Sequence, residues 1–497
     1  MEGLYGVAAF ARAQPGRVAL VAGDRRRSFA ELDARANRLG HAMRALGVGE
    51  RDVVAVAYRN LPEFYDVTLA AARLGADIVP VSWRYKDAEV DHLVTDSGSK
   101  LLFAEPDGPS AGPRTIRRGD EHEALIAGSD PTPLRAPADP APVSMRYYTS
   151  GTTGRPKGVV RAPAPPEALV QRGRGLLHLF GIPEPDHVHL VAGPLYHTAP
   201  CAYSHIALAA GHALVLMDRF DAEEALRLIE RERVTWSHMV PINFVRILNL
   251  PQATRARYDL SSVRRILHAA APCPVETKRR IMAVFPPGSV WEYHGMTESF
   301  GTMITADEWL AKPGSVGRAA MSQTLRILDA DGRELGPGEV GLVYVSALGG
   351  IRFEYGGDPG KTADAWRGDL FTVGDMGYVD DDGYLFLTDR RHDLIITGGA
   401  NVYPAEVEGV LFQHPAVADV VVFGIPDDEW GERVHAVVEP RAPFEPDDLI
   451  AFCRSNLAHF KCPRSIESIE RMPRDENGKV RKREMRERYW EGRERRI

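Results

Sequence analysis

Apolar residues in the first hundred positions alternate between helical and strand spacing. Residues 53–58 and 77–82 are short apolar runs typical of buried strands, and residues 64–74 read as a helix that closes at Gly75. The stretch 27–46 has apolar residues three or four positions apart, which predicts a helix with one buried face: Phe29, Leu32, Ala36, Leu39 and Met43.

The same alternation returns in the middle of the chain. Asp221 with Glu224 predicts a capping box that opens a helix. Strand-like runs then cover 234–240, 264–268 and 290–293, with a helix predicted over 276–285 between the last two. Such alternation is typical of an α/β architecture with a mainly parallel sheet. The stretch 105–143, rich in Pro, Gly, Asp and Arg, is predicted to be a surface loop or a boundary between subdomains.

Length and composition narrow the class of protein. A chain of 497 residues is longer than a domain with a single hydrophobic core usually is, so we expect at least two domains. Its net charge of −7 argues against binding to nucleic acid or to an anionic membrane. The charge-dense end, 479–497, interleaves both signs, which favours a solvated helix.

The cysteines and the apolar runs indicate the cellular compartment and whether the chain crosses a membrane. Four cysteines without a CxxC pair predict neither a disulfide framework nor a zinc site, and favour the cytoplasm. The N-terminus does not read as a signal peptide, and the most apolar run, 202–217, is too short and interrupted to span a bilayer. The oligomeric state stays open.

The segment Tyr148-Thr-Ser-Gly-Thr-Thr-Gly-Arg-Pro-Lys-Gly158 carries the strongest chemical signal. Its glycines allow backbone N–H groups to approach phosphate oxygens, its hydroxyls donate hydrogen bonds, and Lys157 adds charge. A P-loop needs Gly-x4-Gly-Lys-Ser/Thr. The segment 356–362 nearly fits, but Tyr355 stands where the leading glycine belongs, so a P-loop NTPase is rejected.

Further segments follow in a fixed order, and together they resemble the adenylate-forming superfamily of acyl-CoA synthetases, luciferases and peptide-synthetase adenylation domains. The resemblance covers nearly the whole chain. After the phosphate loop its segments are Pro194–His197, Ala269–Pro272, Tyr293–Glu298, Thr372–Asp375, Asp389–Asp393 with Gly398–Asn401, Phe460–Pro463 and Pro473–Lys479.

The resemblance implies two chemical steps with ATP, Mg²⁺ and coenzyme A. A carboxylate and ATP give an acyl-adenylate and pyrophosphate, and a thiol then displaces AMP. Lys479 resembles the catalytic lysine of the first step, where cations must neutralise developing charge. Glu298, with Thr149, resembles the Mg²⁺ site, and His197 borders the thiol entry as a further catalytic candidate.

The nucleotide site is implied in the same way. Asp375 suits the two ribose hydroxyls, Arg390 a second ribose or phosphate contact, and Ala270, Ala271 and Pro272 a flat wall for adenine. The remaining nucleotide-binding residues are Thr149, Ser150, Gly151, Thr152, Thr153, Gly154, Lys157, Tyr293, His294, Gly295, Met296 and Thr297.

The acyl group and coenzyme A also receive candidate residues. Gly398 and Gly399 leave room for pantetheine. No Asp lies in 236–244 to hold an α-amine, which favours a carboxylic acid without one, of fatty, aryl or polycyclic type. The acyl pocket is predicted to be roomy and apolar, lined by Tyr196, His197, Ile242, Phe244, Ala269 and Met296.

The resemblance predicts a large N-terminal AMP-binding body of α/β subdomains, 1–389, and a small mobile α+β lid, 390–497. The hinge is expected at 389–393, with His392 at the hinge position. Within the lid, helices are predicted at 405–412 and 447–457, and strands at 418–423 and 434–438.

One departure from the family pattern leaves the activity open. His294 stands where a tyrosine usually stacks on adenine, and imidazole covers less area. An acyl-CoA synthetase is the first hypothesis. The alternatives are a non-adenylating member that takes a preformed acyl-adenylate, a stand-alone enzyme loading a carrier protein, a luciferase-like oxidase, and a non-catalytic nucleotide-binding paralogue.

Overall fold

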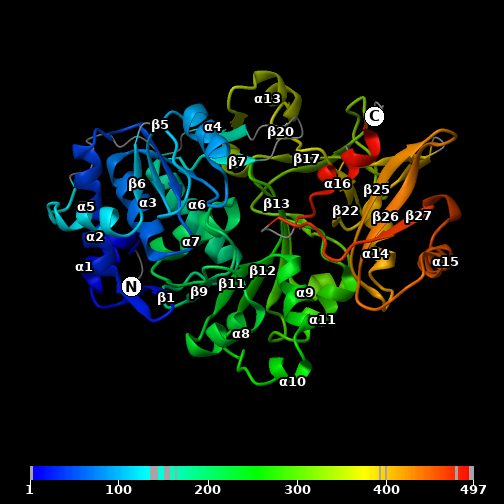
Figure 1. The fold of residues 1–497 in the computed structure, drawn as a ribbon, viewed down its shortest axis with the longest axis horizontal. Coiled ribbons are helices and arrows are strands. Elements are labelled where there is room, and N and C mark those ends of the chain that lie inside the picture. Colours follow the sequence, from blue (N-terminus) through cyan, green and yellow to red (C-terminus); the bar gives the residue numbers. More distant parts are fainter. Residues whose placement is uncertain are drawn as a thin grey trace.

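The computed structural model shows a large body followed by a small C-terminal lid (Figure 1). It describes residues 4–112, 114–134, 144–149, 157–162, 165–390, 393–397, 400–475 and 479–491. In Figure 1 the body runs from blue to yellow, and the lid is the orange and red layer at its side. This division confirms the predicted fold class, whereas the boundary at 389 and the hinge at His392 stay predictions, since His392 lies outside the described residues.

The largest sheet of the body is mainly parallel, as predicted. Its order is β15-β14-β13-β12-β11-β9-β10-β1-β2, and its antiparallel pairings, β1–β2, β13–β14 and β14–β15, lie at its two edges. Its strands are β1 (Val18–Ala22), β2 (Arg25–Ser28), β9 (Val188–Val191), β10 (Ala213–Leu216), β11 (Trp236–Met239), β12 (Arg265–His268), β13 (Val290–Gly295), β14 (Phe300–Ile304) and β15 (Arg318–Ala319).

Successive residues of these strands enter different cores, because side chains alternate between the faces of a strand. Leu20, Val191 and Leu267 belong to one core, and their neighbours Val21 and Leu190 belong to another. The second core packs against α8 (Ala222–Arg231), α9 (Pro241–Asn249) and α11 (Val275–Met282). The sheet is therefore covered on both faces, which explains why its strands read as short apolar runs.

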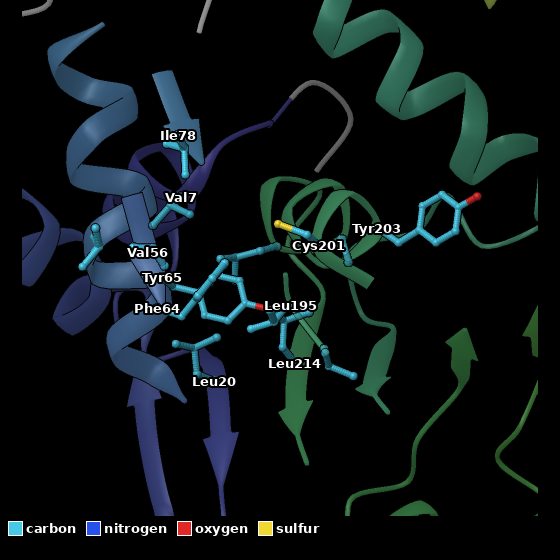
Figure 2. Packing of buried hydrophobic residues seen from close by; sticks show 14 of the residues in the cluster. Val7, Leu20, Val56, Phe64, Tyr65, Ile78, Leu195, Cys201, Tyr203 and Leu214 are labelled. Carbon is cyan, nitrogen blue, oxygen red and sulfur yellow. The ribbon is translucent and has the colours of Figure 1, made fainter. Parts of the chain in front are cut away.

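The first core joins this sheet to a smaller parallel one, β4-β3-β5-β6. Figure 2 shows Phe64 and Tyr65 of α3 beside Leu195 and Leu214 from the large-sheet side. The elements here are α1 (Val7–Ala13), α2 (Phe29–Ala45), β3 (Val53–Ala57), α3 (Pro62–Leu74), β4 (Asp77–Pro80), α4 (Asp87–Ser97), β5 (Ser99–Ala104), β6 (Thr115–Arg117), α5 (Asp120–Ala127), α6 (Pro166–Leu179) and α7 (Thr198–Ala209).

Local signals in these elements are partly confirmed. Gly75 adopts the left-handed conformation that closes α3. Asp221 caps α8 by accepting from the Glu224 backbone N–H at 2.9 Å, but the Glu224 side chain pairs with Arg227, so the capping box is half formed. The stretch 105–143, predicted as a surface loop or a subdomain boundary, contains β6 and α5, so it is not a loop throughout.

A third part of the body was not predicted from the sequence. An antiparallel sheet has the order β19-β20-β17-β21-β22 with β16 beside β17, and a small sheet has the order β18-β8-β7. Its elements are β7 (Tyr147–Thr149), β8 (Lys157–Arg161), β16 (Leu325–Leu328), β17 (Gly341–Ser346), β18 (Phe353–Tyr355), α13 (Pro359–Ala365), β19 (Trp366–Arg367), β20 (Leu370–Phe371), β21 (Asp375–Val379) and β22 (Leu385–Arg390), with α10 (Gln252–Arg255) and α12 (Ala306–Ala311) elsewhere in the body.

The lid is an α+β unit, as predicted, built around a long hairpin. Its sheet has the order β24-β23-β26-β25, with β27 beside β26. The hairpin strands β25 (Val417–Asp427) and β26 (Gly431–Pro440) are far longer than the predicted ones. The other elements are β23 (Ile395–Thr397), β24 (Ala400–Val402), α14 (Pro404–Leu411), α15 (Pro446–Asn456), η2 (His459–Lys461), β27 (Ser465–Ser468) and α16 (Lys482–Trp490).

In the described part of the chain, none of the helices combines the length and apolar character needed to cross a membrane.

Candidate active site

The candidate site lies where parallel strands of the large sheet end. β12 runs into Ala269–Pro272, and β13 runs into Gly295–Glu298. Because β12 and β13 are parallel neighbours, these two segments leave the same edge of the sheet. The structure thus brings together the predicted adenine wall and the predicted metal-binding segment.

Ala270, in the adenine wall, has a strained backbone. Its φ of 76° lies in the left-handed region, where an alanine costs about 1–2 kcal/mol. Ala269 is buried beneath it, whereas Ala270 and Pro272 are exposed. A strained, exposed turn between a buried strand and a ligand site is typical of a functional segment.

His294 and Asp375 form a hydrogen-bonded pair in the site. His294 Nε2 lies 2.9 Å from Asp375 Oδ2, and both side chains are nearly buried. Since an ionised carboxylate only accepts, Nε2 donates and fixes the carboxylate's orientation. Arg390 lies directly opposite Asp375 in the β21–β22 ladder, so the two predicted ribose contacts are neighbours.

Glu298, the predicted metal ligand, is held by a residue that the sequence did not single out. Tyr355 donates its hydroxyl to Glu298 Oε1 at 2.7 Å, and Glu298 is only 8% exposed. The neighbouring Thr297 accepts a side-chain hydrogen bond from Thr198 at 3.2 Å, and its carbonyl accepts from Arg161. The described residues contain no group of three His, Cys, Asp or Glu side chains placed to hold a metal. One carboxylate suits Mg²⁺, which substrate phosphates complete.

The two ends of the phosphate loop face each other across β7 and β8. Thr149 and Lys157 are register partners, which closes the loop at its base. The tip of the loop lies outside the described residues, namely Ser150, Gly151, Thr152, Thr153 and Gly154. Lys157 forms an ion pair with Asp358, and Gly356 N–H donates to the Gly158 carbonyl at 2.8 Å. The near-P-loop segment 356–362 therefore lies beside the phosphate loop.

Lys479 of the lid acts electrostatically on His197 of the body. A turn holds the lysine: its N–H donates to Asp475 Oδ1 at 2.8 Å, and Asp475 N–H donates back to the Lys479 carbonyl. Burial, together with the positive charge of Lys479, lowers the pKa of His197 to about 3. His197 is therefore neutral at physiological pH, and the positive charge of Lys479 acts on its ring.

The predicted acyl-pocket residues divide into two environments. Tyr196 and His197 are partly exposed neighbours with ring centroids 4.5 Å apart. Phe244, by contrast, is fully buried in the second core and packs on His268. Ile242 and Met296 are half-buried, and Ala269 is buried.

Two rings that the sequence did not single out, Tyr203 and His238, contact Tyr293, a predicted nucleotide-binding residue. Tyr293 donates or accepts a 3.0 Å hydrogen bond with His238 Nε2, and Tyr203 packs edge-on against both rings. A histidine within the buried strand Trp236–Met239 was the available signal for this cluster.

The predicted pantetheine residues Gly398 and Gly399 lie outside the described residues, but their surroundings are described. Thr397 pairs with Gly431 at the turn of the lid hairpin, and β24 contacts η2. Trp430, next to Gly431, and Phe460 of η2 are 36% and 45% exposed.

Comparisons with known proteins identify the family. The chain matches the AMP-binding enzyme family over residues 7–351 and the AMP-binding enzyme C-terminal domain over residues 406–479. It belongs to the AMP-binding enzyme family. The resemblance inferred from the ordered segments is thereby confirmed.

Similar proteins cover nearly the full chain. A fatty acid–[acyl-carrier-protein] ligase of Streptomyces coeruleorubidus is 34% identical over 97% of this chain and 95% of its own length. A feruloyl-CoA synthase of Amycolatopsis sp. is 34% identical over 96% and 97%. The structure of the o-succinylbenzoate CoA synthetase of Bacillus subtilis, in complex with its acyl-adenylate intermediate, aligns with a TM-score of 0.83 at 28% identity, covering 99% of both chains.

These matches bear out the predicted enzyme class, an AMP-forming acid–thiol ligase. The individual site residues remain predictions, which the geometry above makes testable.

Proposed function

We propose that this protein is an AMP-forming acyl-CoA ligase that adenylates a carboxylic acid lacking an α-amine and transfers the acyl group to coenzyme A. The observation that carries the proposal is the electrostatic effect of the lid residue Lys479 on the body residue His197, whose pKa the lysine helps to lower. This effect across the two parts of the chain supports an arrangement in which the lysine serves adenylation.

The first half-reaction follows from the charges in the site. The substrate carboxylate attacks the α-phosphate of ATP, the bond to the β-phosphate breaks, and pyrophosphate leaves. Lys479 offsets the negative charge that the two anions bring together. Asp375, oriented by His294, accepts hydrogen bonds from the ribose hydroxyls. Glu298 would hold Mg²⁺, which neutralises phosphate charge when bound.

The lid surface supports coenzyme A as the thiol carrier. Arg464 stacks over the Trp430 ring at 4.4 Å, and the Lys461 amine lies 5.9 Å from the Phe460 ring centroid. Exposed aromatic rings suit an adenine, and neighbouring cations suit phosphates. Trp430 adjoins Gly431, the partner of Thr397, and Phe460 lies in η2, which contacts β24. The thiol would then attack the acyl carbon and release AMP.

The family's curated members act on varied acids, so the acid of this chain is inferred from its own residues. Half-buried Ile242 and Met296 favour an apolar acyl group, while the Tyr203, His238 and Tyr293 cluster adds hydrogen-bonding capacity at its side. An aryl or aryl-alkyl acid fits this mixture best. The four free cysteines suit a reducing compartment such as the cytoplasm.

A carrier protein is the second candidate acceptor, favoured by the likeness to the Streptomyces coeruleorubidus enzyme. To test the acceptor, purified enzyme is incubated with ATP, Mg²⁺ and a panel of aryl and fatty acids, with either coenzyme A or a phosphopantetheinylated carrier protein. Mass spectrometry then identifies the thioester. We expect acyl-CoA, and we expect Trp430→Ala and Phe460→Ala to raise the KM for coenzyme A without affecting pyrophosphate release. Thioester on the carrier protein alone would overturn the choice of acceptor.

A further inference from the structure

Lys361 lies in the near-P-loop segment, which the adenylation chemistry described above does not use. The segment is tied to the phosphate loop through its backbone, because β18 pairs with β8 and Gly356 N–H donates to the Gly158 carbonyl at 2.8 Å. Within the segment, Asp358 accepts from the Lys361 backbone N–H at 2.9 Å, and Thr362 Oγ1 accepts from the Tyr355 N–H at 3.0 Å. These bonds fix the position from which the Lys361 side chain starts.

Tyr355 places the amine of Lys361 beside the metal-binding carboxylate. The Lys361 Nζ lies 3.9 Å from the centroid of the Tyr355 ring, and the hydroxyl of the same ring donates to Glu298 at 2.7 Å. One aromatic side chain therefore holds a cation on its face and a carboxylate at its tip. Glu298 also acts electrostatically on Lys361, raising the pKa of the amine against the larger lowering effect of burial.

The ion pairs around this ring leave Lys361 available to a ligand. Lys157 takes the carboxylate of Asp358, and among the described residues Lys361 forms no ion pair of its own. A half-buried ammonium over a ring face, without an ion pair among the described residues, has hydrogen-bond donors to spare. With Lys157 it makes two cations at the closed base of the phosphate loop.

We propose that Lys361 is a further catalytic cation, which with Lys157 binds the β- and γ-phosphates of ATP and so holds the pyrophosphate leaving group. The inference rests on the proposed adenylation. Lys479 faces the reacting carboxylate, whereas Lys361 acts on the group that departs. The two lysines thus neutralise opposite ends of the same displacement.

The test separates pyrophosphate from AMP, since AMP lacks the two phosphates that Lys361 binds. Calorimetry measures Mg-pyrophosphate and AMP binding to wild type, Lys361→Gln and Lys361→Arg. Lys361→Gln is expected to weaken pyrophosphate binding by about tenfold to a hundredfold and to leave AMP binding unchanged, with partial recovery in Lys361→Arg. Lys312→Gln is the matched control, because Lys312 also lies over a tyrosine ring, that of Tyr384, but pairs with Asp380 away from the site.

Two results would overturn the inference: unchanged pyrophosphate binding in Lys361→Gln, or an equal loss for AMP. A second measurement needs no variant. In wild-type protein, Mg-pyrophosphate should protect Lys361 from acetylation by acetic anhydride, read by peptide mass spectrometry, while AMP should not. The labelling of Lys312 should be the same with and without either ligand. Equal labelling with and without pyrophosphate would contradict the proposal. Because neither measurement needs turnover, both stay separate from failure of the proposed ligase activity, which shows as absent thioester.

Discussion

Lys479→Ala should separate the two half-reactions. Lys479 lies on a turn of the lid held by reciprocal hydrogen bonds with Asp475, and its charge acts on the half-buried ring of His197. At a separation of about 4 Å and an effective dielectric of about 20, one charge pair is worth about 4 kcal/mol. Losing it at the transition state should slow adenylation by about 10²–10³-fold.

The assay compares acid-dependent ATP–pyrophosphate exchange with thioester formation from a synthetic acyl-adenylate and coenzyme A. We expect exchange to collapse and thioester formation to stay near the wild-type rate. Lys482→Ala is the control, because Lys482 lies three positions further along the lid and pairs with Glu408 at 3.2 Å. An equal loss in both half-reactions would refute the assignment of the lysine to the first step only.

Three further predictions concern the nucleotide and the stability of the body. Asp375→Ala should raise the KM for ATP by a factor corresponding to about 1.5–3 kcal/mol, read by steady-state kinetics, and an unchanged KM would remove Asp375 from the ribose site. Lys278→Ala should lower the free energy of unfolding, measured by urea denaturation, by about 3–5 kcal/mol, because it leaves the buried Glu292 carboxylate unpaired. Combining Lys278→Ala with Glu292→Gln should recover part of this loss. Burial lowers the pKa of His205 and His238 to about 4 each, so below pH about 6.5 the unfolded chain binds more protons than the folded one. The free energy of unfolding should therefore fall between pH about 6.5 and pH 4, by about 1.4 kcal/mol per pH unit for each histidine. A flat pH profile would contradict the burial argument.

The sequence predicts the parallel part of the fold well because its signals are local. The helix at 29–45 and the strand at 53–57 match their apolar spacing, and Gly75 ends its helix as expected. One edge of the antiparallel sheet escapes prediction because its strands β19 and β20 are too short to show a pattern. Strand β20 is only Leu370–Phe371, and it gains its stability from pairing with β17.

The site residues likewise divide into those that the sequence predicts and those that only the structure shows. Ordered segments predict Lys479, Glu298 and Asp375, since each lies in a characteristic run of residues. Tyr355 and Lys361 escape as site residues because Tyr355 is 57 positions from the carboxylate that it contacts. The pairing of His294 with Asp375 likewise joins two segments 81 positions apart. Only the folded structure shows that the near-P-loop segment lies against the phosphate loop.

Acid-dependent ATP–pyrophosphate exchange reports directly on whether the protein adenylates a carboxylic acid. Wild-type enzyme is given ATP, Mg²⁺, labelled pyrophosphate and each acid of an aryl and fatty acid panel, without coenzyme A. The account predicts exchange with at least one acid, because His294 still orients Asp375 and Lys479 still acts electrostatically on His197. Silence across the panel, together with coenzyme A-dependent consumption of a synthetic acyl-adenylate, would contradict it.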